Sequence, residues 1–372
     1  MKILFTNFHG GDGGGHTTYL TALAGALAAR HDIHVAAPAG SRLLREAKAL
    51  PGVHAIAQAF PNGLGSVLPR QRARRKLARY IRAHAFDIVH VNGSADHRLV
   101  VSTLRGLPFR PRIVLTKHNS KPVRRLGSIW RSRHTDQVIA VSEHTRLELS
   151  KTAYARCRLD TVHNGVDVMH YAPWPAAESA GERRRWAGAA TLLLGSSAGT
   201  ASYKGWMDLV EALAMLPPRQ RAQIHVLLAG KPPAQAQRAR IEALGLDGQV
   251  HFPGLLDDVR PAIAAIDVGF VLSYDVETIS FACREMMSMG KPVLLTEYAG
   301  LPENITVGRD GWLVPVRDPK AIADTLLQML AHRDALPAMG DAARARAVAD
   351  FGIERFVEKT EAVYARLLAS HD

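Results

Sequence analysis

The sequence predicts an α/β protein of two similar domains in tandem, each built on a mostly parallel sheet. Short apolar runs alternate with amphipathic segments through both halves of the chain, as in parallel sheets covered by helices on both faces. The chain has 372 residues, 47% of them hydrophobic, so it can bury two cores. Residues 171–190 lose the alternation and gain proline, alanine and charge, which predicts a linker. We place the first domain at residues 1–170 and the second at 171–352, followed by a helical segment in 353–372.

In the first half, the apolar runs predict strands and the segments between them predict helices. Ser142 precedes the sequence EHTRLEL, which predicts a helix with a serine N-cap. The predicted strands cover residues 3–8, 33–37, 53–57, 88–91, 113–116 and 138–141, and the predicted helices cover 17–29, 42–49, 70–82 and 142–149.

The second half repeats this alternation. Its last helix is amphipathic and follows a break at residues 350–352. The predicted strands cover residues 191–194, 224–228, 250–252, 268–272 and 293–296, and the predicted helices cover 206–216, 234–244, 259–265, 280–288 and 353–368.

Composition excludes several classes of protein. No stretch approaches ~18 apolar residues without a charge, and a strand begins directly after Lys2, so we expect neither a membrane span nor a signal peptide. We therefore expect a cytoplasmic location. Cys157 and Cys283 lie far apart, outside any ligand-like spacing, which predicts reduced thiols and no structural zinc or other metal site.

Positive charge is concentrated in the first half. Residues 1–170 carry 26 Lys and Arg against 10 Asp and Glu, an excess of +16, whereas the remainder carries 21 against 24. The charge gathers in residues 70–82 and 117–133. Three interpretations stand: a solvated helix surface, attraction to anionic lipid or a phosphorylated acceptor, or nucleic-acid binding. Few aromatic residues and no recognisable nucleic-acid module accompany the charge, so we expect no nucleic-acid partner.

A glycine-rich turn, GGDGGGHTTYL at residues 10–20, follows the first predicted strand and opens a helix. The dinucleotide-binding pattern fails here, because counting from Gly11 places His16 where the third glycine should fall. The second strand is followed by Pro38 and lacks the acidic residue that would hold an adenosine ribose. We therefore expect no nicotinamide or flavin cofactor. Glycines allow the backbone to approach a ligand closely, so we expect this turn to contact a different ligand.

Two carboxylates frame the start of a helix in the second half. Glu277 lies in the loop and Glu285 in the second helical turn, so both can face one cleft. The amides of residues 278–282 would face the same space and favour a phosphate. Glu285 can accept two hydrogen bonds from a ribose diol, and Lys204 can place an ammonium on a diphosphate.

At these residues the chain resembles the retaining nucleotide-sugar glycosyltransferases of the GT-B fold, in particular glycosyltransferase family 4. The resemblance covers nearly the whole chain, and the ordered set of motifs is more specific than any single one. In chain order the motifs are MKILFTNF with the glycine-rich turn, DIVHVNG, VIAVSEHTRLEL, VHNGVDVMHYAP, YKGWMDLVEAL, HFPGLLDDV, VETISFACREMMSMGKPVL, AGLPENI and DGWLVP.

The resemblance implies two Rossmann-like domains facing each other across a cleft, with the C-terminal helix returning to the first domain. It implies that the first domain binds the acceptor and the second the nucleotide sugar. Glu285 matches the glutamate on the ribose, Glu277 the one on the donor sugar, and Lys204 the lysine on the diphosphate. The implied catalytic residues are His118, Lys204 and Glu277; the implied donor-binding residues are Gly13, Gly14, Gly15, Lys204, Thr278, Ile279, Ser280, Phe281 and Glu285; and the acceptor side has His16 and His118.

Two departures from the family pattern affect the donor site. Ala198 and Gly199 stand where the family usually has an arginine paired with the lysine, and Lys231 is one possible substitute beside its simpler role as a solvated loop residue. Thr278 and Ser280 replace the usual glycines, so the identity of the sugar cannot be taken from the family. Glu303 is interpreted only as a carboxylate at a helix start.

The expected function is transfer of a sugar, with retention, from a nucleotide-diphosphate sugar to a glycan or lipid-linked acceptor in cell-surface polysaccharide or lipopolysaccharide synthesis. The chain has no Asp-x-Asp pair, which indicates a metal-independent reaction without a cofactor. The basic first half suggests peripheral binding to the inner face of an anionic membrane. The alternatives are a nucleotide-sugar epimerase of the same fold and a basic, non-catalytic binding protein.

Overall fold

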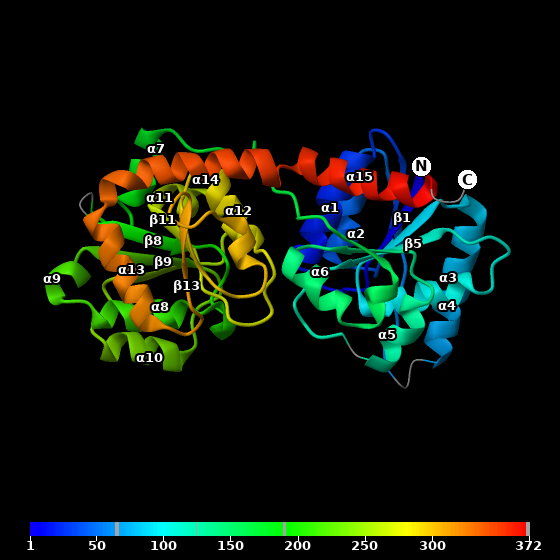
Figure 1. The fold of residues 1–372 in the computed structure, drawn as a ribbon, viewed down its shortest axis with the longest axis horizontal. Helices are drawn as coiled ribbons and strands as arrows, with labels where there is room; N and C mark the ends of the chain where they lie inside the picture. Colours follow the sequence, from blue (N-terminus) through cyan, green and yellow to red (C-terminus); the bar gives the residue numbers. More distant parts are fainter. Residues whose placement is uncertain (64–66, 124, 189–190, 370–372) are drawn as a thin grey trace. The chain divides into compact units, whose positions relative to one another are not determined.

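A computed structural model describes residues 1–63, 67–123, 125–188 and 191–369 (Figure 1). Arg124 of the basic stretch, residues 189–190 of the predicted linker and the last three residues of the range 353–372 lie outside the described residues. The chain divides into two compact units. Unit 1 comprises Met1–Gly165 with Ile353–Asp372, and unit 2 comprises Val166–Gly352.

Unit 1 is built on a seven-stranded parallel sheet with the order β3-β2-β1-β4-β5-β6-β7. Strands β4 and β6 are buried along their whole length, as expected for short, mostly apolar strands inside a parallel sheet. The strands are β1 (Lys2–Thr6), β2 (Asp32–Ala37), β3 (Val53–Ala57), β4 (Ile88–Val91), β5 (Arg112–Lys117), β6 (Gln137–Ala140) and β7 (Arg158–Thr161).

Helices cover this sheet, and Ser142 caps α6 by accepting a hydrogen bond from the Thr145 amide at 3.1 Å, as predicted. The helices are α1 (Gly15–Leu27), α2 (Arg42–Ala49), α3 (Val67–His84), α4 (Ser94–Leu104), α5 (Arg125–Ser132), α6 (Glu143–Ser150), the 3-10 turn η1 (Ala153–Arg156) and α15 (Ile353–Ala369).

The C-terminal helix α15 belongs to unit 1 and packs beside α1, the two lying together as red and blue ribbons in Figure 1. The Tyr19 and Phe356 rings lie 5.0 Å apart, and the Tyr364 hydroxyl lies 2.6 Å from Nδ1 of His90 on β4. A segment distant in sequence therefore completes the core of the first sheet.

Unit 2 is built on a six-stranded parallel sheet with the order β10-β9-β8-β11-β12-β13. Its strands are β8 (Leu192–Ser196), β9 (Ile224–Ala229), β10 (Val250–Gly254), β11 (Val268–Val271), β12 (Val293–Thr296) and β13 (Gly311–Val314). Its helices are α7 (Ala176–Arg183), η2 (Ser202–Lys204), α8 (Trp206–Met215), α9 (Pro218–Arg221), α10 (Gln235–Ala243), α11 (Arg260–Ala265), α12 (Phe281–Ser288), η3 (Leu301–Asn304), α13 (Pro319–Ala331), η4 (Arg333–Ala335) and α14 (Leu336–Phe351).

The prediction of two α/β domains with parallel sheets is confirmed. The predicted linker differs from the structure, because its residues 176–183 form α7, which packs on α11 of unit 2. Arg183 on α7 pairs with Asp267 at 2.7 Å. The cause is tertiary: α7 has only eight residues and buries none of them completely, so its packing on α11 and this ion pair fix its place.

Both sheets share one topological feature. In unit 1 the chain starts at β1 and extends outward to β3 before it reverses to β4, and in unit 2 it starts at β8 and reverses between β8 and β11. Ligands of open parallel sheets bind at such reversals, beyond the carboxyl ends of the strands. The loops after β1 and β4, and those after β8 and β11, are therefore where a functional site is expected.

Candidate functional site

Lys204 and Glu277 meet at the strand reversal of unit 2. Lys204 ends the turn η2, which follows β8, and Glu277 lies in the loop after β11. The Tyr274 amide donates to the Tyr203 carbonyl at 3.0 Å and joins the two loops. The Lys204 ammonium lies 2.7 Å from the Glu277 carboxylate. Two of the predicted site residues, 73 positions apart in the sequence, thus form one ion pair.

This ion pair is largely shielded from solvent. The Lys204 side chain is 16% exposed and that of Glu277 10%. The Ser273 hydroxyl lies 3.3 Å from the Glu277 carboxylate, and the Lys204 ammonium lies 5.3 Å from the centroid of the Tyr203 ring. Because a partly buried charge without a partner is costly, each member of the pair holds the other in place.

The glycine after the lysine is required by geometry. Gly205 has a φ of 68°, a left-handed conformation, and it precedes the first residue of α8. A Cβ at this position would lie 1.9 Å from the Leu272 carbonyl oxygen. Only glycine allows the Lys204 turn to lie directly against the end of β11.

The loop from β11 to α12 carries backbone strain. Val276 and Ser280 have φ values of 53° and 54°, and a positive φ is rare for a residue with a Cβ, most of all for a β-branched one. Ser280 offsets part of this cost because its hydroxyl accepts a hydrogen bond from the Cys283 amide at 3.4 Å and caps α12. Strain of this kind concentrates at functional sites.

The other residues of this loop differ in what they can offer a ligand. Thr278 is buried, Phe281 is half-buried, and the Ile279 side chain is 1% exposed and packs in the core. The Ile279 carbonyl accepts a hydrogen bond from the Asn304 amide group at 2.8 Å. Ile279 can therefore contact a donor only through its backbone amide.

Glu285 lies on α12, beside Tyr171, a residue that the sequence analysis did not identify as part of the site. It is half-buried, and burial raises the pKa of its carboxyl group to about 7. The neighbouring Tyr171 hydroxyl counters this effect, and burial together with the Glu285 carboxylate raises the pKa of Tyr171. Tyr171 comes from the start of the predicted linker, so no periodicity marked it as a site residue.

A buried arginine on α12 fixes the position of this helix. Arg284 is completely buried, donates to the Asn304 side chain at 2.9 Å and stacks 3.9 Å from the Phe351 ring. Asn304 lies in the turn η3 of the AGLPENI motif. The motif therefore contributes to the site by fixing the loop and helix that carry the two glutamates, while Glu303 contacts Arg346 through its backbone carbonyl.

Cations available to replace the missing family arginine differ in their surroundings. Lys231 is exposed, and its carbonyl accepts a hydrogen bond from the Thr200 hydroxyl. Arg317, which follows β13, stacks 4.0 Å from the ring of Tyr274. Tyr274 is the residue whose backbone joins the loop of Lys204. The structure thus brings Arg317, which the sequence did not suggest, to the edge of the sheet that holds the ion pair.

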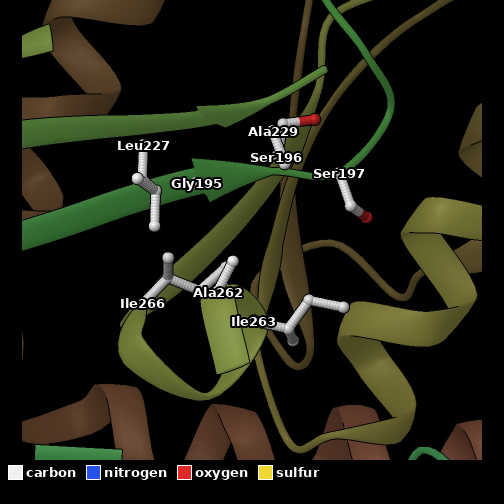
Figure 2. A pocket seen from close by; sticks show the side chains of 8 residues that line it. All are labelled: Gly195, Ser196, Ser197, Leu227, Ala229, Ala262, Ile263 and Ile266. Atoms are coloured by element: carbon white, nitrogen blue, oxygen red, sulfur yellow. The ribbon is translucent and has the colours of Figure 1, made fainter. Parts of the chain in front are cut away.

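A small cavity lies below the carboxyl end of β8, between the sheet and α11 (Figure 2). Its volume of about 10 Å³ accommodates about one water molecule, so it cannot hold a nucleotide. Gly195 permits close packing there, because a Cβ would lie 2.4 Å from Ile266. The residues that line the cavity are Gly195, Ser196, Ser197, Leu227, Ala229, Ala262, Ile263 and Ile266.

At the strand reversal of unit 1, the predicted acceptor-side histidines lie together. The His16 and His118 rings are 4.3 Å apart, and His9 continues the stack at 4.4 Å from His16. His118 Nε2 lies 2.8 Å from the Asn92 side-chain oxygen, and Tyr19 contacts the His118 ring edge-on at 4.5 Å. The structure therefore adds His9 and Asn92, which sequence analysis missed because they follow two different strands.

These histidines are neutral at physiological pH. Burial lowers the pKa of His16 to about 3, and burial with the neighbouring histidines lowers that of His118 well below its usual range. Burial also lowers the pKa of Lys117 to about 8, so this neighbouring ammonium keeps most of its charge at pH 7. The histidines can thus donate and accept hydrogen bonds as uncharged groups, and the positive charge beside them comes from Lys117.

The glycine-rich turn leads into this cluster. Gly13 and Gly14 have φ values of 73° and 48°, and Gly15 begins α1. A Cβ on Gly13 would lie 2.4 Å from the Thr17 hydroxyl. Asp12 accepts a hydrogen bond from the Gly14 amide at 2.9 Å. The turn places His16 in the first turn of α1, where it contacts His118.

The basic face of unit 1 is carried by α3. Ala73, Leu77 and Ile81 face the core, while the arginines between them and Lys76 are exposed. Val67 and Leu68, at the start of α3, are 57% and 68% exposed. A hollow of about 330 Å³ lies beside the helix, and its lining residues are Gln58, Ala59, Pro61, Pro69, Arg72, Ala73 and Lys76. None of the helices in the described ranges has the length and apolar character needed to cross a membrane.

Comparisons with known proteins agree with this architecture. Residues 13–170 match the family model Glycosyltransferase Family 4, and residues 191–332 match the model Glycosyl transferases group 1. The chain is 26% identical over 358 residues, 92% of each chain, to a GDP-mannose-dependent alpha-(1-6)-phosphatidylinositol monomannoside mannosyltransferase of Mycolicibacterium smegmatis. It is 25% identical over 303 residues to the N-acetyl-alpha-D-glucosaminyl L-malate synthase of Bacillus anthracis, which covers 79% of this chain and 78% of the relative.

Among solved structures, HepE from Anabaena, crystallised with UDP and glucose, matches with a TM-score of 0.81 at 20% identity over 98% of this chain and 99% of HepE. The two parallel-sheet domains and these matches define a glycosyltransferase of the GT-B fold. The chain is a glycosyltransferase of the family 4 type, because its first half matches the Glycosyltransferase Family 4 model and its second half the Glycosyl transferases group 1 model.

Proposed function

We propose that this glycosyltransferase moves a sugar, with retention of configuration, from a nucleotide-diphosphate sugar bound by unit 2 to a glycan or lipid-linked acceptor bound by unit 1. The observation that carries the proposal is the shielded Lys204–Glu277 pair at the strand reversal of unit 2. A cation held at the carboxyl edge of a parallel sheet, beside a strained loop and the start of α12, suits a diphosphate.

In the proposed complex, the donor diphosphate takes the place of Glu277 as the partner of Lys204. Glu277 is then free to accept hydrogen bonds from the donor sugar. Arg317, stacked on Tyr274, supplies a second cation to the phosphates. Negative charge grows on the leaving diphosphate as the glycosidic bond breaks, so prearranged cations stabilise the transition state more than the ground state.

Glu285 is proposed to hold the nucleotide ribose, with Tyr171 beside it. The Glu285 carboxylate can accept hydrogen bonds from both hydroxyls of a cis-diol. A pKa of about 7 means that the carboxylate must ionise for its strongest binding. Donor affinity is therefore expected to rise with pH through neutrality.

The neutral histidine cluster is proposed to contact the acceptor. Uncharged imidazoles suit the hydroxyl groups of sugars, which both donate and accept hydrogen bonds. In a retaining reaction on one face of the sugar, the departing diphosphate takes the proton of the acceptor hydroxyl, and His118 then has only to position that hydroxyl. This division of roles requires no metal ion, because Lys204 and Arg317 carry the positive charge.

A lipid-linked acceptor is supported by α3. Its exposed arginines, with Val67 and Leu68 at the helix start, combine charge and apolar groups as anionic membrane surfaces require. The hollow beside Arg72 and Lys76 has the size for a phosphorylated headgroup. We propose a cytoplasmic protein that binds the inner membrane face and acts in the synthesis of a cell-surface glycoconjugate.

The test starts from a thermal-shift screen of nucleotide sugars, because a ligand stabilises the fold according to its affinity and concentration. The best donor is then incubated with and without lipid-linked and glycan acceptors, in the presence and absence of EDTA. Transfer that depends on an acceptor and resists EDTA supports the proposal. Conversion of the donor to an epimer without acceptor would favour the epimerase alternative, and absence of turnover with every donor that binds would favour the non-catalytic one.

A further inference from the structure

A second cluster of ligand-type side chains lies at the opposite edge of the first sheet. Asp32 and His34 are two residues apart on β2, so they point to the same face, and His54 on β3 is directly in register with His34. Asp32 is the first residue of β2 and pairs with Lys2, the first of β1. The cluster therefore lies at the amino end of the strands, whereas the histidines near the glycine-rich turn follow their carboxyl ends.

The three side chains converge on one point. His34 Nε2 lies 2.9 Å from the Asp32 Oδ1, and His54 Nε2 lies 3.8 Å from the same oxygen. One ligand atom from each residue lies within 4.8 Å of the other two. In a tetrahedral zinc site with bonds of about 2.0–2.1 Å, neighbouring ligand atoms are roughly 3.3 Å apart. The observed separations bracket that value, so small side-chain rotations suffice to place an ion between them.

The surrounding contacts prepare these atoms for a metal. His34 is 2% exposed, and its Nδ1 lies 2.5 Å from the Tyr80 hydroxyl of α3, which orients the ring and leaves Nε2 for a metal. Lys2 binds the other oxygen of Asp32 at 3.0 Å, so Oδ1 is the one turned to the histidines. The ring of His84 on α3 packs against the His34 ring, with the two centroids 4.8 Å apart, and lies outside the group of converging ligand atoms.

The chemistry of the donor set points to the metal. Two imidazole nitrogens with one carboxylate oxygen suit Zn²⁺ better than Mg²⁺ or Ca²⁺, which prefer ligand sets made of oxygen atoms.

We propose that Asp32, His34 and His54 bind a zinc ion that ties β2 and β3 together at the edge of unit 1, with water in the fourth position. The site lies at the other edge of the sheet from the proposed sugar chemistry, so it is structural and independent of transfer. The zinc would steady the strands against which the basic helix α3 packs.

The test measures zinc binding directly in the full chain. Protein treated with EDTA and exchanged into chelator-free buffer is titrated with ZnCl₂ by calorimetry, and its melting temperature is recorded with and without the ion. We expect one equivalent to bind at micromolar or lower Kd and to raise the melting temperature, whereas MgCl₂ leaves both unchanged. Co²⁺ should give the visible bands of a tetrahedral nitrogen and oxygen site without a thiolate charge-transfer band.

His54→Ala and Asp32→Asn should each weaken zinc binding by at least ~10-fold. The His54 side chain is 66% exposed, so its removal leaves the fold intact, which circular dichroism checks. His332→Ala, an exposed histidine of unit 2, is the matched control and should bind zinc normally. His251→Ala tests a rival pair, since His251 Nε2 lies 2.9 Å from His225 Nδ1. Absence of zinc binding, or binding that His251→Ala abolishes and His54→Ala does not, would overturn the proposal.

Discussion

The two units have parallel sheets that reverse direction after their first strand, yet the edges at those reversals differ in charge. Unit 2 places a shielded ion pair there, Lys204 with Glu277, whereas unit 1 places a stack of neutral histidines around His118. The topology fixes where a site can form, and the side chains in the loops decide what it can bind. An ion pair beside a helix start suits phosphates and uncharged imidazoles suit sugar hydroxyls, and the proposed assignment of donor and acceptor to the two units rests on this difference.

The largest expected effect comes from removing the cation of unit 2. Lys204→Ala should lower turnover roughly 10²–10³-fold, because the charge on the leaving diphosphate loses a prearranged partner. Steady-state kinetics with the identified donor measure the effect. Lys231→Ala removes an exposed lysine of the same unit and should change turnover less than ~2-fold, in line with small surface effects. Near-normal turnover in Lys204→Ala would remove the main support for the donor site.

A double-mutant cycle sharpens this result. Lys204→Ala, Glu277→Gln and the combined variant should show non-additive losses of melting temperature, because either single change leaves one shielded group without its partner. Additive losses would mean that the two side chains act independently in solution.

The next effect concerns the ribose. Glu285→Gln should weaken donor binding by about 10- to 100-fold, since a hydrogen bond to a charged group contributes about 1.5–3 kcal/mol. The pKa of Glu285 is about 7, above its usual range, so the carboxylate is protonated below this pH and ionised above it. The donor Kd of the native enzyme should therefore fall by roughly tenfold from pH 6 to pH 8, as one titrating group predicts. Calorimetry across this range should find a flat profile in Glu285→Gln, and equal slopes in both proteins would contradict the assignment.

A smaller effect is expected on the histidine cluster of unit 1. His118→Ala should lower kcat/KM for the acceptor by roughly tenfold through lost hydrogen bonding, with the donor Kd unchanged. Because its pKa is well below the usual range, His118 should produce no inflection of the native rate profile between pH 6 and pH 8. His144→Ala, an exposed histidine of the same unit, serves as the control. A large loss of donor affinity in His118→Ala would contradict the proposal that unit 1 binds the acceptor and unit 2 the donor.

The smallest effect tests the strained loop of unit 2. Ser280→Gly should leave the free energy of unfolding unchanged or raise it by up to about 1 kcal/mol, because glycine accepts a positive φ and costs little as an N-cap. Ser280→Ala keeps the strain and loses the capping hydroxyl, so it should destabilise by about 1 kcal/mol. Chemical denaturation measures the free energy of unfolding of both variants. A higher value for Ser280→Ala than for Ser280→Gly would show that glycine does not relieve the strain at this position.

The local sequence already contained most of the fold, because strands and helices follow from apolar periodicity within single segments. The capped helix at Ser142, the helix start at Ser280 and the short buried strands were predicted from neighbouring residues alone. By contrast, α7 lies within the predicted linker, since this short helix is held by contacts with α11 and Asp267. Strand β13 was also missed, because this partly buried strand begins at a glycine and lies at the edge of its sheet, where it is not a continuous buried apolar run.

What the sequence by itself determined was the set of side chains and the order of the motifs that carry them, because both are properties of one segment at a time. Tertiary structure decided their partners. It paired Lys204 with Glu277, placed Tyr171 beside Glu285 and stacked His16 on His118, all across loops that only sheet topology brings together. It also decided the chemistry of these groups, because the burial that makes His118 neutral and raises the pKa of Glu285 to about 7 exists only in the folded chain.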